Sequence, residues 1–267
     1  MTEVVAGFVI ERHEMVGSTS LLARERIAGG AAPTGPTALV AATQCGGVGR
    51  LGRRWVSPAG GLWFTAVWPL PAGSNLPPSL GLRLGVACLR AVGAICARAG
   101  AGSASLHLKW PNDVLVNRGK VLGVLTETVL EPGTNRRWVL AGVGLNANFS
   151  GARFGAELAD RGVPATTLRD ELGRDVDLRA ALALLLAEAR EELAAPGLRV
   201  GTLGQARAGL WGLGRPATVA TRQGAVRGLL RGLSDAGEPV LDVPGAGPVE
   251  CAGAGGVVIE PPGPASR

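Results

Sequence analysis

The sequence predicts a fold of the α/β (α+β) class: a mixed β-sheet flanked by helices, followed by a small β-barrel. Apolar runs rich in β-branched residues alternate with segments of helical periodicity through most of the chain. From about Gly214, short β runs separated by Gly and Pro turns replace that pattern. A length of 267 residues, 46% of them hydrophobic, suits one large and one small domain. We expect these domains at residues 1–210 and 211–267.

The N-terminal part predicts a strand, a turn, a helix and a Pro/Gly loop, followed by two strands. In order, these elements are residues 7–14, 16–19, 21–30, 31–36, 37–43 and 61–68. Residues 44–60, between the last two strands, carry no secondary-structure signal. Loops of this length inside a compact domain are usually functional, so this segment is the first candidate for a site.

The middle and C-terminal parts predict a long helix, three strands, a helix-rich segment and the barrel. The helix covers 78–99, with apolar residues at 82, 84, 86, 89, 92, 95 and 96. Residues 106–110 run on into 113–116 as one strand, a hairpin turn at 117–119 leads to 121–130, and 138–145 follows. The helix-rich segment is 166–195, ended by Pro196 and Gly197. The barrel strands are expected at 216–221, 225–233, 239–243 and 257–261.

Composition favours a cytoplasmic protein without a membrane or nucleic-acid partner. The net charge of +6 suits anionic ligands, but no dense Lys/Arg block indicates general nucleic-acid binding. The four cysteines form no CxxC pair, which argues against zinc or a disulfide framework and fits a reducing compartment. No secretion signal and no run of 18 apolar residues is visible.

The two lysines, Lys109 and Lys120, stand out among 25 arginines. A strong drift of composition toward arginine has spared these two positions alone. Arginine does not replace lysine where a compact ammonium must fit a tight site, so both are candidates for chemistry. Chance survival is the alternative interpretation.

The stretch QCGGVGRLGRRW, residues 44–55, indicates an anion-binding loop. Its glycines let backbone N–H groups approach a ligand, and its arginines offer forked donors for phosphate or carboxylate oxygens. It is neither a P-loop nor a dinucleotide fingerprint, because GxxxxGK[ST] is absent and no helix follows immediately. Taken alone, a solvated loop without a ligand explains it equally well.

Three further motifs place polar residues at the ends or in the middle of predicted strands. They are KWPNDVLV at 109–116, KVLGVLTE at 120–127 and GVGLNAN at 142–148. The Asn112–Asp113 pair must be hydrogen-bonded or serve a site, and Gly123 inside a strand suggests close approach of a ligand or backbone. Asn146 and Asn148 are expected as two exposed amides at a strand end. Each motif alone could equally be a turn, a cap or a bulge.

Together with GST at 17–19, these motifs resemble, in order along the whole chain, the signature series of the biotin–protein ligases. These enzymes are also called biotin–acetyl-CoA-carboxylase ligases, and KWPND with GRxGRxW is highly specific for them. The resemblance implies a class II synthetase-like catalytic domain with an SH3-like C-terminal barrel. Bifunctional members carry an N-terminal DNA-binding domain, whereas this chain resembles the monofunctional class, so we expect no operator DNA as partner.

The resemblance implies a two-step reaction. Biotin, as a substrate, is activated with MgATP to biotinyl-5′-AMP with release of pyrophosphate, and the biotinyl group passes to one lysine of a biotin carboxyl carrier domain. The expected cofactor is therefore Mg²⁺ with ATP, and no resident metal site is expected. The reaction needs two anionic groups brought together and an anhydride shielded from water, which a glycine-rich basic lid over the site would supply.

The resemblance also implies the site residues. The expected biotin-binding residues are Ser18, Thr19, Ser20 (where an Asn is common), Gln44, Gly47, Val48, Gly49, Arg50, Lys120 and Gly123. The expected ATP-binding residues are Arg53, Trp55, Asn112, Asp113 and Asn146, with Trp55 covering the adenine. Lys120, Arg50 and Arg53 are expected to be catalytic, because cations there stabilise developing charge.

The chain departs from the family pattern at Val48 and Leu51, where basic residues are common. Two fewer charges on the lid should weaken electrostatic retention of the adenylate. Two other functions were weighed: a lipoate–protein ligase of the same fold, and a non-catalytic biotin- or nucleotide-binding sensor. The KWPND and GRxGRxW set disfavours the first and the retained Lys120 the second. The sequence leaves open the carrier's identity, the role of the barrel, and whether a homodimer forms.

Overall fold

The computed structural model describes residues 2–71, 73–74, 76, 79–154 and 163–260 of the chain. A large sheet contains β1 (Val4–Val5), β2 (Phe8–Val16), β3 (Thr37–Gln44), β4 (Leu62–Pro69), β5 (Leu106–Lys109), β6 (Asp113–Val116), β7 (Gly119–Leu130) and β8 (Arg137–Leu145). The helices are α1 (Thr19–Ala28), α2 (Leu80–Arg98), α3 (Leu168–Leu172), α4 (Leu178–Ala194) and α5 (Val200–Ala208). A second sheet, called here the C-terminal sheet, contains β9 (Pro216–Thr221), β10 (Gly224–Leu233), β11 (Pro239–Val243), β12 (Gly247–Glu250) and β13 (Gly256–Ile259).

The large sheet is mixed, with strand order β1-β2-β3-β4-β8-β7-β6-β5. Only β2 and β3 pair in parallel among its described strands, and α1 provides the crossover that a parallel pair requires. The C-terminal sheet is antiparallel with order β12-β11-β10-β9-β13. The predicted fold class, a mixed sheet flanked by helices and followed by a small β unit, is therefore confirmed.

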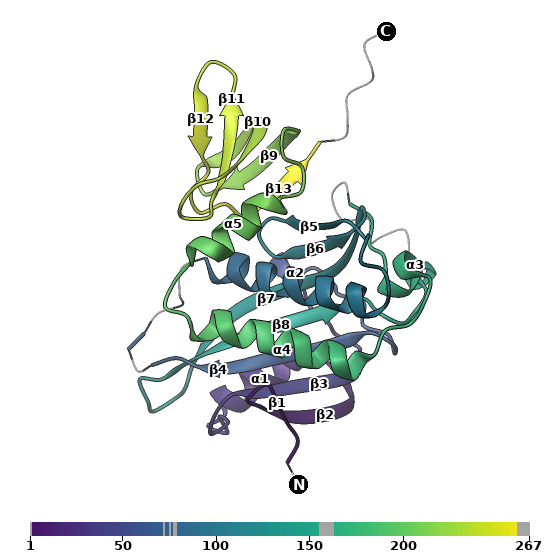
Figure 1. The fold of residues 1–267 in the computed structure, drawn as a ribbon. Helices are drawn as coiled ribbons and strands as arrows, with labels where there is room; N and C mark the ends of the chain where they lie inside the picture. The colour runs from purple at the N-terminus through teal and green to yellow at the C-terminus, as the bar shows by residue number, and fades with distance from the viewer. Residues whose placement is uncertain (1, 72, 75, 77–78, 155–162, 261–267) are drawn as a thin grey trace.

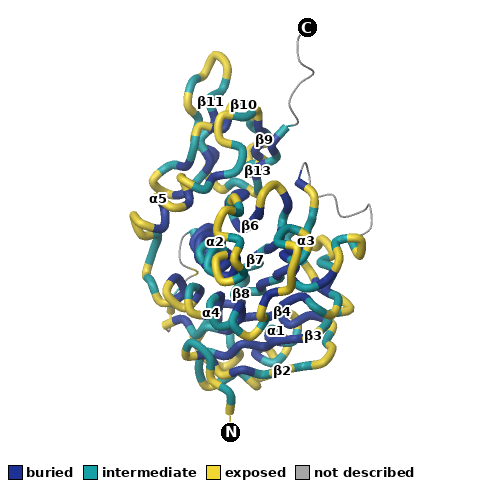
Figure 2. Tube along the Cα trace, turned by 45° about the vertical axis from the view of Figure 1, so that its right-hand side comes forward, coloured by how far each residue is buried: buried dark blue, intermediate teal, exposed yellow. Residues whose placement is uncertain are grey.

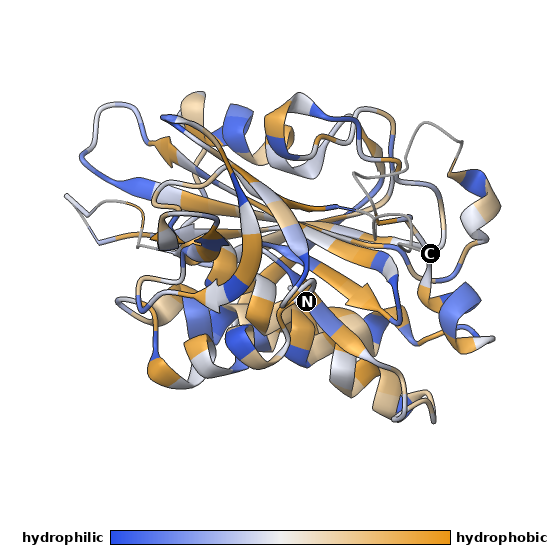
Figure 3. Cartoon of the chain, turned by 90° about the horizontal axis from the view of Figure 1, so that it is seen from above, coloured by the Kyte–Doolittle hydropathy of each residue, from blue (hydrophilic) through white to orange (hydrophobic). Residues whose placement is uncertain are grey.

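Alternation along β8 assigns the two faces of the large sheet. Val139, Ala141, Val143 and Leu145 belong to the core cluster that also contains the buried faces of α2 and α4. On the opposite face, Trp138 and Leu140 pack with Ala23 and Ile27 of α1. Figure 1 shows α2 and α4 on one side of the strands and α1 on the other, and Figure 3 shows hydrophobic residues along the strands between them.

The α1 face is only partly covered by its helix. Beyond Trp138 and Leu140, the next two residues of β8 on that face are Gly142 and Gly144, which have no side chain to fill the space. The chain returns over this uncovered part as the segment between β3 and β4. The fold thus leaves a shallow region on the sheet, bordered by the start of α1 and by this segment.

Helix α2 is the central helix of the other face, and a buried ion pair links it to α4. By length and composition α2 could cross a membrane, but 67% of the relevant window is buried inside this fold, so packing accounts for its apolarity. Arg83 of α2 and Glu192 of α4 are both 0% exposed, and Arg83 Nε lies 3.4 Å from Glu192 Oε2. Figure 2 shows the strands of the large sheet mostly buried and the tips of the C-terminal sheet exposed.

The C-terminal sheet shares its core with the rest of the chain. One cluster of buried residues combines Leu82 of α2 and Leu108 of β5 with Leu203 of α5 and with Val219 and Leu241 of the C-terminal sheet. Leu108 also forms a parallel bridge to Leu210, which closes the β5 edge of the large sheet. In Figure 1, α5 lies between the two sheets. The boundary between the two predicted domains, 1–210 and 211–267, stays a prediction.

One predicted strand was wrong. Residues 106–116 form not one strand but an antiparallel hairpin, in which Lys109 pairs with Asp113. Pro111 has no N–H to donate to a ladder, so the chain turns at Trp110–Asn112 instead of continuing. The prediction from the sequence also missed β1, α5 and β12, and it placed the start of α1 two residues late. The first residues of the helix predicted from 78 lie outside the described residues.

Candidate functional site

Three glycines form a floor on the α1 face of the large sheet. Gly123 of β7 pairs with Gly144 of β8, and Gly142 lies two residues before Gly144 on the same face. A Cβ on Gly144 would meet the Trp55 indole nitrogen at 2.4 Å, and one on Gly142 would meet Ser20 Oγ at 2.6 Å. The side chains above these glycines leave no room for even a methyl group, so only glycine fits at these positions.

The first turn of α1 borders one end of this floor. Ser18 is the N-cap residue, with extended backbone, and its hydroxyl accepts a 3.4 Å hydrogen bond from the Leu21 amide. Thr19 and Ser20 follow as the first helical residues. Because the helix begins here rather than at residue 21, all three predicted residues of this group lie together at the helix start.

A connected set of hydroxyl and amide groups links this turn to β3 and β4. The Thr19 amide donates to Gln44 Oε1 at 2.8 Å, and the Thr19 hydroxyl lies 3.2 Å from the same oxygen. Thr65 Oγ1 of β4 lies 2.8 Å from Thr19 Oγ1 and 2.9 Å from Ser20 Oγ. Gln44 Nε2 donates to Ser57 Oγ at 2.8 Å. This polar end of the site is well suited to a compact ligand ring with donors and acceptors.

The glycine-rich segment returns over the floor as a narrow loop whose base is fixed. Gly46 N donates to Gly17 O at 2.7 Å, and Trp55 N donates to Gly47 O at 2.8 Å. A Cβ on Gly47 would lie 2.4 Å from the Trp55 carbonyl oxygen, so the two sides of the loop can approach this closely only at a glycine.

The tip of this loop is exposed. Val48 is 53% exposed and Leu51 is 78% exposed, and Leu51 has a positive φ of 58°. Gly49 N donates to Arg53 O at 2.7 Å, and Arg53 Nε donates to Arg50 O at 3.3 Å. Val48 and Leu51 therefore contribute nothing to the core, and the role of this loop as a lid stays a prediction.

Trp55 covers the middle of the floor. Its indole lies against Gly123 and Gly144, and the Lys120 ammonium is 5.1 Å from the ring centroid. The indole N–H is buried and has no hydrogen-bond partner among the described residues. The aromatic wall predicted for the nucleotide thus stands beside the lysine, directly above the glycine floor.

Lys120 lies at the other end of the floor from the hydroxyl cluster. Its Nζ is 2.8 Å from Asp113 Oδ2, and both side chains are 14% exposed. The pairing of β6 with β7 shifts register between Val114 and Leu115, next to Lys120. Such a bulge re-aims neighbouring side chains, which brings Lys120 to the floor together with Gly123.

Arg50 connects the loop to two distant parts of the chain. Its Nη1 donates to Asn112 Oδ1 at 3.0 Å, and its Nη2 donates to the carbonyl of Gly255, next to β13, at 2.5 Å. The Asn112 amide in turn donates to Val124 O of β7. Burial lowers the pKa of Arg50, while the Asp113 carboxylate raises it and Arg53 lowers it. The guanidinium stays charged under any such shift and is held close to the lysine end of the floor.

Asn146 was predicted to be exposed, but it is buried in the structure. It is only 2% exposed, because its amide nitrogen donates to Thr166 O at 3.0 Å and lies 3.4 Å from Lys120 O. Asn148 is also partly buried and exchanges hydrogen bonds with the backbone of Val176. A strand end that meets a following loop needs such groups to satisfy its backbone, which explains the burial. Asn146 Oδ1 has no partner among the described residues.

Sequence reasoning missed four residues of this site. Thr65 and Ser57 complete the hydroxyl cluster, and Gly142 and Gly144 form the floor. The signal for Thr65 was present, since it is a lone polar residue in the apolar strand LWFTAVW. The glycines alternate in GVGLNAN, a spacing that places both on one face of a strand.

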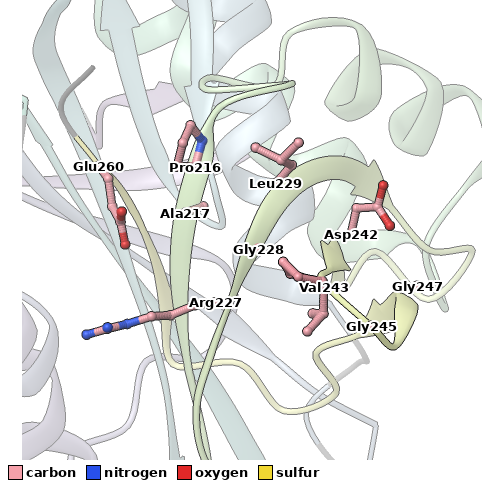
Figure 4. Close-up of a pocket in the computed structure, with 11 residues that line it drawn as sticks. Pro216, Ala217, Arg227, Gly228, Leu229, Asp242, Val243, Gly245, Gly247 and Glu260 are labelled. Atoms are coloured by element: carbon pink, nitrogen blue, oxygen red, sulfur yellow. The ribbon is translucent and has the colours of Figure 1, made fainter. Parts of the chain in front are cut away.

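A separate hollow of about 640 Å³ lies on the C-terminal sheet, between β9, β10 and the turn after β11. Its charged residues are Arg227 of β10, Asp242 of β11 and Glu260, which follows β13, and Figure 4 shows Arg227 and Asp242 pointing away from each other. It shares no residue with the glycine floor. We therefore place the candidate site on the large sheet.

The geometry suits a ligand that is polar at one end and anionic at the other. Ser20 and Trp55 lie over Gly142 and Gly144, which are about 7 Å apart along a strand. One end offers hydroxyl and amide groups, and the other offers Lys120 and Arg50. No group of three or more His, Cys, Asp or Glu that could hold a metal occurs among the described residues.

Comparison with known proteins gives matches over most of the chain. A sequence model of the family described as 'Biotin/lipoate A/B protein ligase family' matches residues 18–146 of this chain. A biotin–[acetyl-CoA-carboxylase] ligase of Paracoccus denitrificans is 32% identical over 215 residues, covering 79% of this chain and 86% of that protein. The bifunctional ligase/repressor BirA of Bacillus subtilis is 34% identical over 66% of this chain, which spans about half (50%) of its length.

Solved structures show the same fold. A biotin protein ligase from Aquifex aeolicus in complex with biotin and ATP superposes with a TM-score of 0.77 at 28% identity, covering 94% of this chain and 99% of that one. A biotin protein ligase from Leishmania major in complex with biotinyl-5-AMP has a TM-score of 0.58 at 25% identity, covering 90% and 97%.

Proposed function

This chain belongs to the biotin/lipoate protein ligase family, and from that premise we infer that it is a biotin–protein ligase. It joins biotin to a protein at the expense of ATP, first forming biotinyl-5′-AMP and pyrophosphate. One observation carries the assignment to this site: the Lys120 ammonium, 2.8 Å from Asp113, stands beside Trp55 at the end of the glycine floor opposite the hydroxyl cluster.

In the first step, the ureido ring of biotin lies at the hydroxyl end, near Ser18, Thr19, Ser20 and Gln44. The aliphatic chain then runs over the floor beside Trp55, and the carboxylate reaches Lys120 and Arg50. Attack of a carboxylate oxygen on the α-phosphate brings two anions together, and the two cations offset the repulsion and the developing charge. Asp113, whose Oδ2 lies 2.8 Å from Lys120 Nζ, orients the ammonium.

The nucleotide lies on the side of Arg53, Trp55, Asn112, Asp113 and Asn146. Mg²⁺ enters with ATP, since magnesium in such sites is held chiefly by substrate phosphates and one or two carboxylates. Asp113 is the carboxylate available at this end of the floor.

The glycine-rich loop shields the adenylate. Its tip residues Val48 and Leu51 are exposed without ligand, and closure would place them over the bound anhydride. Because Val48 and Leu51 carry no charge, these two side chains add no ionic attraction to the phosphate. Retention of the adenylate then depends on Arg50 and Arg53.

In the second step, the ε-amine of one lysine of an acceptor protein attacks the anhydride carbonyl, and AMP leaves. The acceptor proposed is the biotin carboxyl carrier domain of a biotin-dependent carboxylase, in line with the printed name of the Paracoccus relative. We also propose that the chain acts in the cytoplasm, because its scattered cysteines fit a reducing compartment.

The test is release of pyrophosphate by the purified chain. Biotin with MgATP should release pyrophosphate, and addition of a carrier domain should label one lysine with biotin, seen as a single mass increase. Lipoate in place of biotin should give neither. Pyrophosphate release with lipoate alone would reassign the chain to the lipoate branch of the family, and binding of biotin without release would make it a sensor.

A further inference from the structure

Thr65 is the one fully buried hydroxyl of the described site. It lies on β4, is 0% exposed, and pairs across the ladder with Gly142 of the floor. Its Oγ1 touches two hydroxyls of the α1 first turn, at 2.8 Å to Thr19 and 2.9 Å to Ser20. Thr65 therefore links the helix start to the floor.

The direction of the hydrogen bonds around Thr65 follows from one backbone group. The Thr19 amide can only donate, so the oxygen and not the nitrogen of the Gln44 side-chain amide faces it, at 2.8 Å. The Gln44 nitrogen accordingly donates to Ser57 Oγ at 2.8 Å on the other side. The amide orientation is thereby fixed.

This orientation propagates through the hydroxyls. Each hydroxyl has one proton to donate, and Gln44 Oε1 has none, so the Thr19 hydroxyl donates to Gln44 Oε1 at 3.2 Å. Thr65 must then donate to Thr19 across their 2.8 Å contact. Ser20 must in turn donate to Thr65 across 2.9 Å. The chain of donors runs Ser20, Thr65, Thr19, Gln44.

Ser20 is consequently left with lone pairs only on the side of the floor, where its Oγ lies over Gly142. Ser18 has the opposite character, because its hydroxyl accepts from the Leu21 amide and keeps its proton to donate. We propose that Thr65 is a positioning residue that sets Ser20 as a pure acceptor for a ligand N–H. Resting on the proposed function, this N–H belongs to the ureido ring of biotin, whose carbonyl needs the donor that Ser18 supplies.

The first experiment compares Thr65→Val, which keeps the shape and removes the hydroxyl, with the wild-type chain. Biotin affinity measured by calorimetry should fall roughly 3- to 10-fold, the loss typical of one neutral hydrogen bond. ATP affinity, and the rate of pyrophosphate release at saturating biotin, should stay unchanged. Thr65→Ser should restore biotin affinity. Thr37→Val, at another buried threonine of the large sheet (5% exposed), controls for loss of a buried hydroxyl.

A double-mutant cycle tests whether Thr65 acts through Ser20. Ser20→Ala should weaken biotin binding, and adding Thr65→Val to it should weaken binding no further. Additive losses, wild-type affinity in Thr65→Val, or an equal loss in Thr37→Val would each overturn the proposal. These results are distinct from failure of the proposed function, in which the wild-type chain itself would release no pyrophosphate with biotin.

Discussion

At the scale of single residues, the two lysines that the sequence singled out have different places. Lys109 lies on β5 next to the turn at Trp110, is only 6% exposed, and pairs across the hairpin with Asp113. Lys120 meets the Asp113 carboxylate at the end of the floor. Composition alone could not separate the two. The bulge between β6 and β7 brings Lys120 to the face of Gly123, whereas Lys109 stays in the tight hairpin before Pro111.

We expect Lys120→Ala to slow adenylate formation by about 2–4 kcal/mol in activation free energy, the cost of removing one preorganised charge-stabilising group. Lys120→Arg should also be slow, because a planar guanidinium needs more room beside Trp55 and Asp113 than an ammonium. Single-turnover pyrophosphate release measures both. Arg222→Ala, at an exposed turn of the C-terminal sheet, serves as control. A near-normal rate in Lys120→Arg would show that an ammonium is not required.

We expect Gly144→Ala to weaken biotin binding strongly, because the new methyl group would lie 2.4 Å from the Trp55 indole nitrogen and displace the ring. Intrinsic Trp fluorescence and biotin calorimetry should change together. Gly201→Ala, in α5 with open space around it, is the matched control and should leave binding intact. Unchanged binding in Gly144→Ala would mean that Trp55 does not line the biotin path.

At the scale of elements, the loop between β3 and β4 combines a base held by backbone hydrogen bonds with a tip whose two apolar side chains are exposed. The backbone contacts of Gly46 and Trp55 anchor its base, whereas Val48 and Leu51 are exposed. Fixing a residue costs about 1–2 kcal/mol of backbone entropy, so ordering the tip needs new contacts. Those contacts would come from Arg50 and Arg53 with carboxylate and phosphate groups.

Amide exchange should therefore slow at residues 48–53 when biotin and MgATP are both present, and change little at Gly46 and Trp55. Hydrogen–deuterium exchange with peptide resolution measures this, and ATP without biotin is the control. Equal exchange at the tip with and without ligands would contradict the lid account and favour a preformed loop.

Most strands and the two long helices could be predicted, because a buried face or a fully buried strand leaves a clear apolar pattern. The turn at Pro111 was missed since LHLKWPNDVLV is apolar on both sides of the break. α5 was missed because VGTLGQARA has two glycines and no clear apolar stripe, and packing against the C-terminal sheet rather than propensity stabilises it.

The site could be predicted where it depends on local motifs and not where it depends on long-range contacts. Lys120, Asp113 and Gly123 lie in two neighbouring motifs, and they meet as expected. Nothing near Thr65 in the sequence shows that it joins Thr19 to Ser20. The buried state of Asn146 likewise depends on Thr166, which no local pattern links to it.

At the scale of the whole molecule, one buried carboxylate holds the helical layer together. Glu192 of α4 is 0% exposed and accepts hydrogen bonds from Arg90 and Arg199, as well as from Thr202 of α5. It also pairs with Arg83 of α2. Burial raises the pKa of Glu192, but the hydrogen bonds lower it and leave it below its ordinary value of 4.5.

We expect Glu192→Gln to lower the free energy of unfolding by about 3 kcal/mol at pH 7, because it leaves the fully buried Arg83 guanidinium without a counter-charge. A pKa lowered in the folded state stabilises the fold above pH 4.5 and loses that effect as pH falls through the folded value. The difference from wild type should thus shrink in acid. Urea unfolding at pH 7 and below pH 4.5 measures it, with Glu191→Gln, 68% exposed, as control. A gap that stays constant with pH would contradict this.

The hydrogen bond from Arg50 to the Gly255 carbonyl spans 205 residues of sequence. During synthesis at about 5–20 residues per second, Arg50 emerges roughly 10 to 40 s before the residue that seats it. A growing chain therefore carries the glycine floor and Lys120 well before its guanidinium has its final partner. Assembly of the site therefore includes a contact that can form only after Gly255 has left the ribosome.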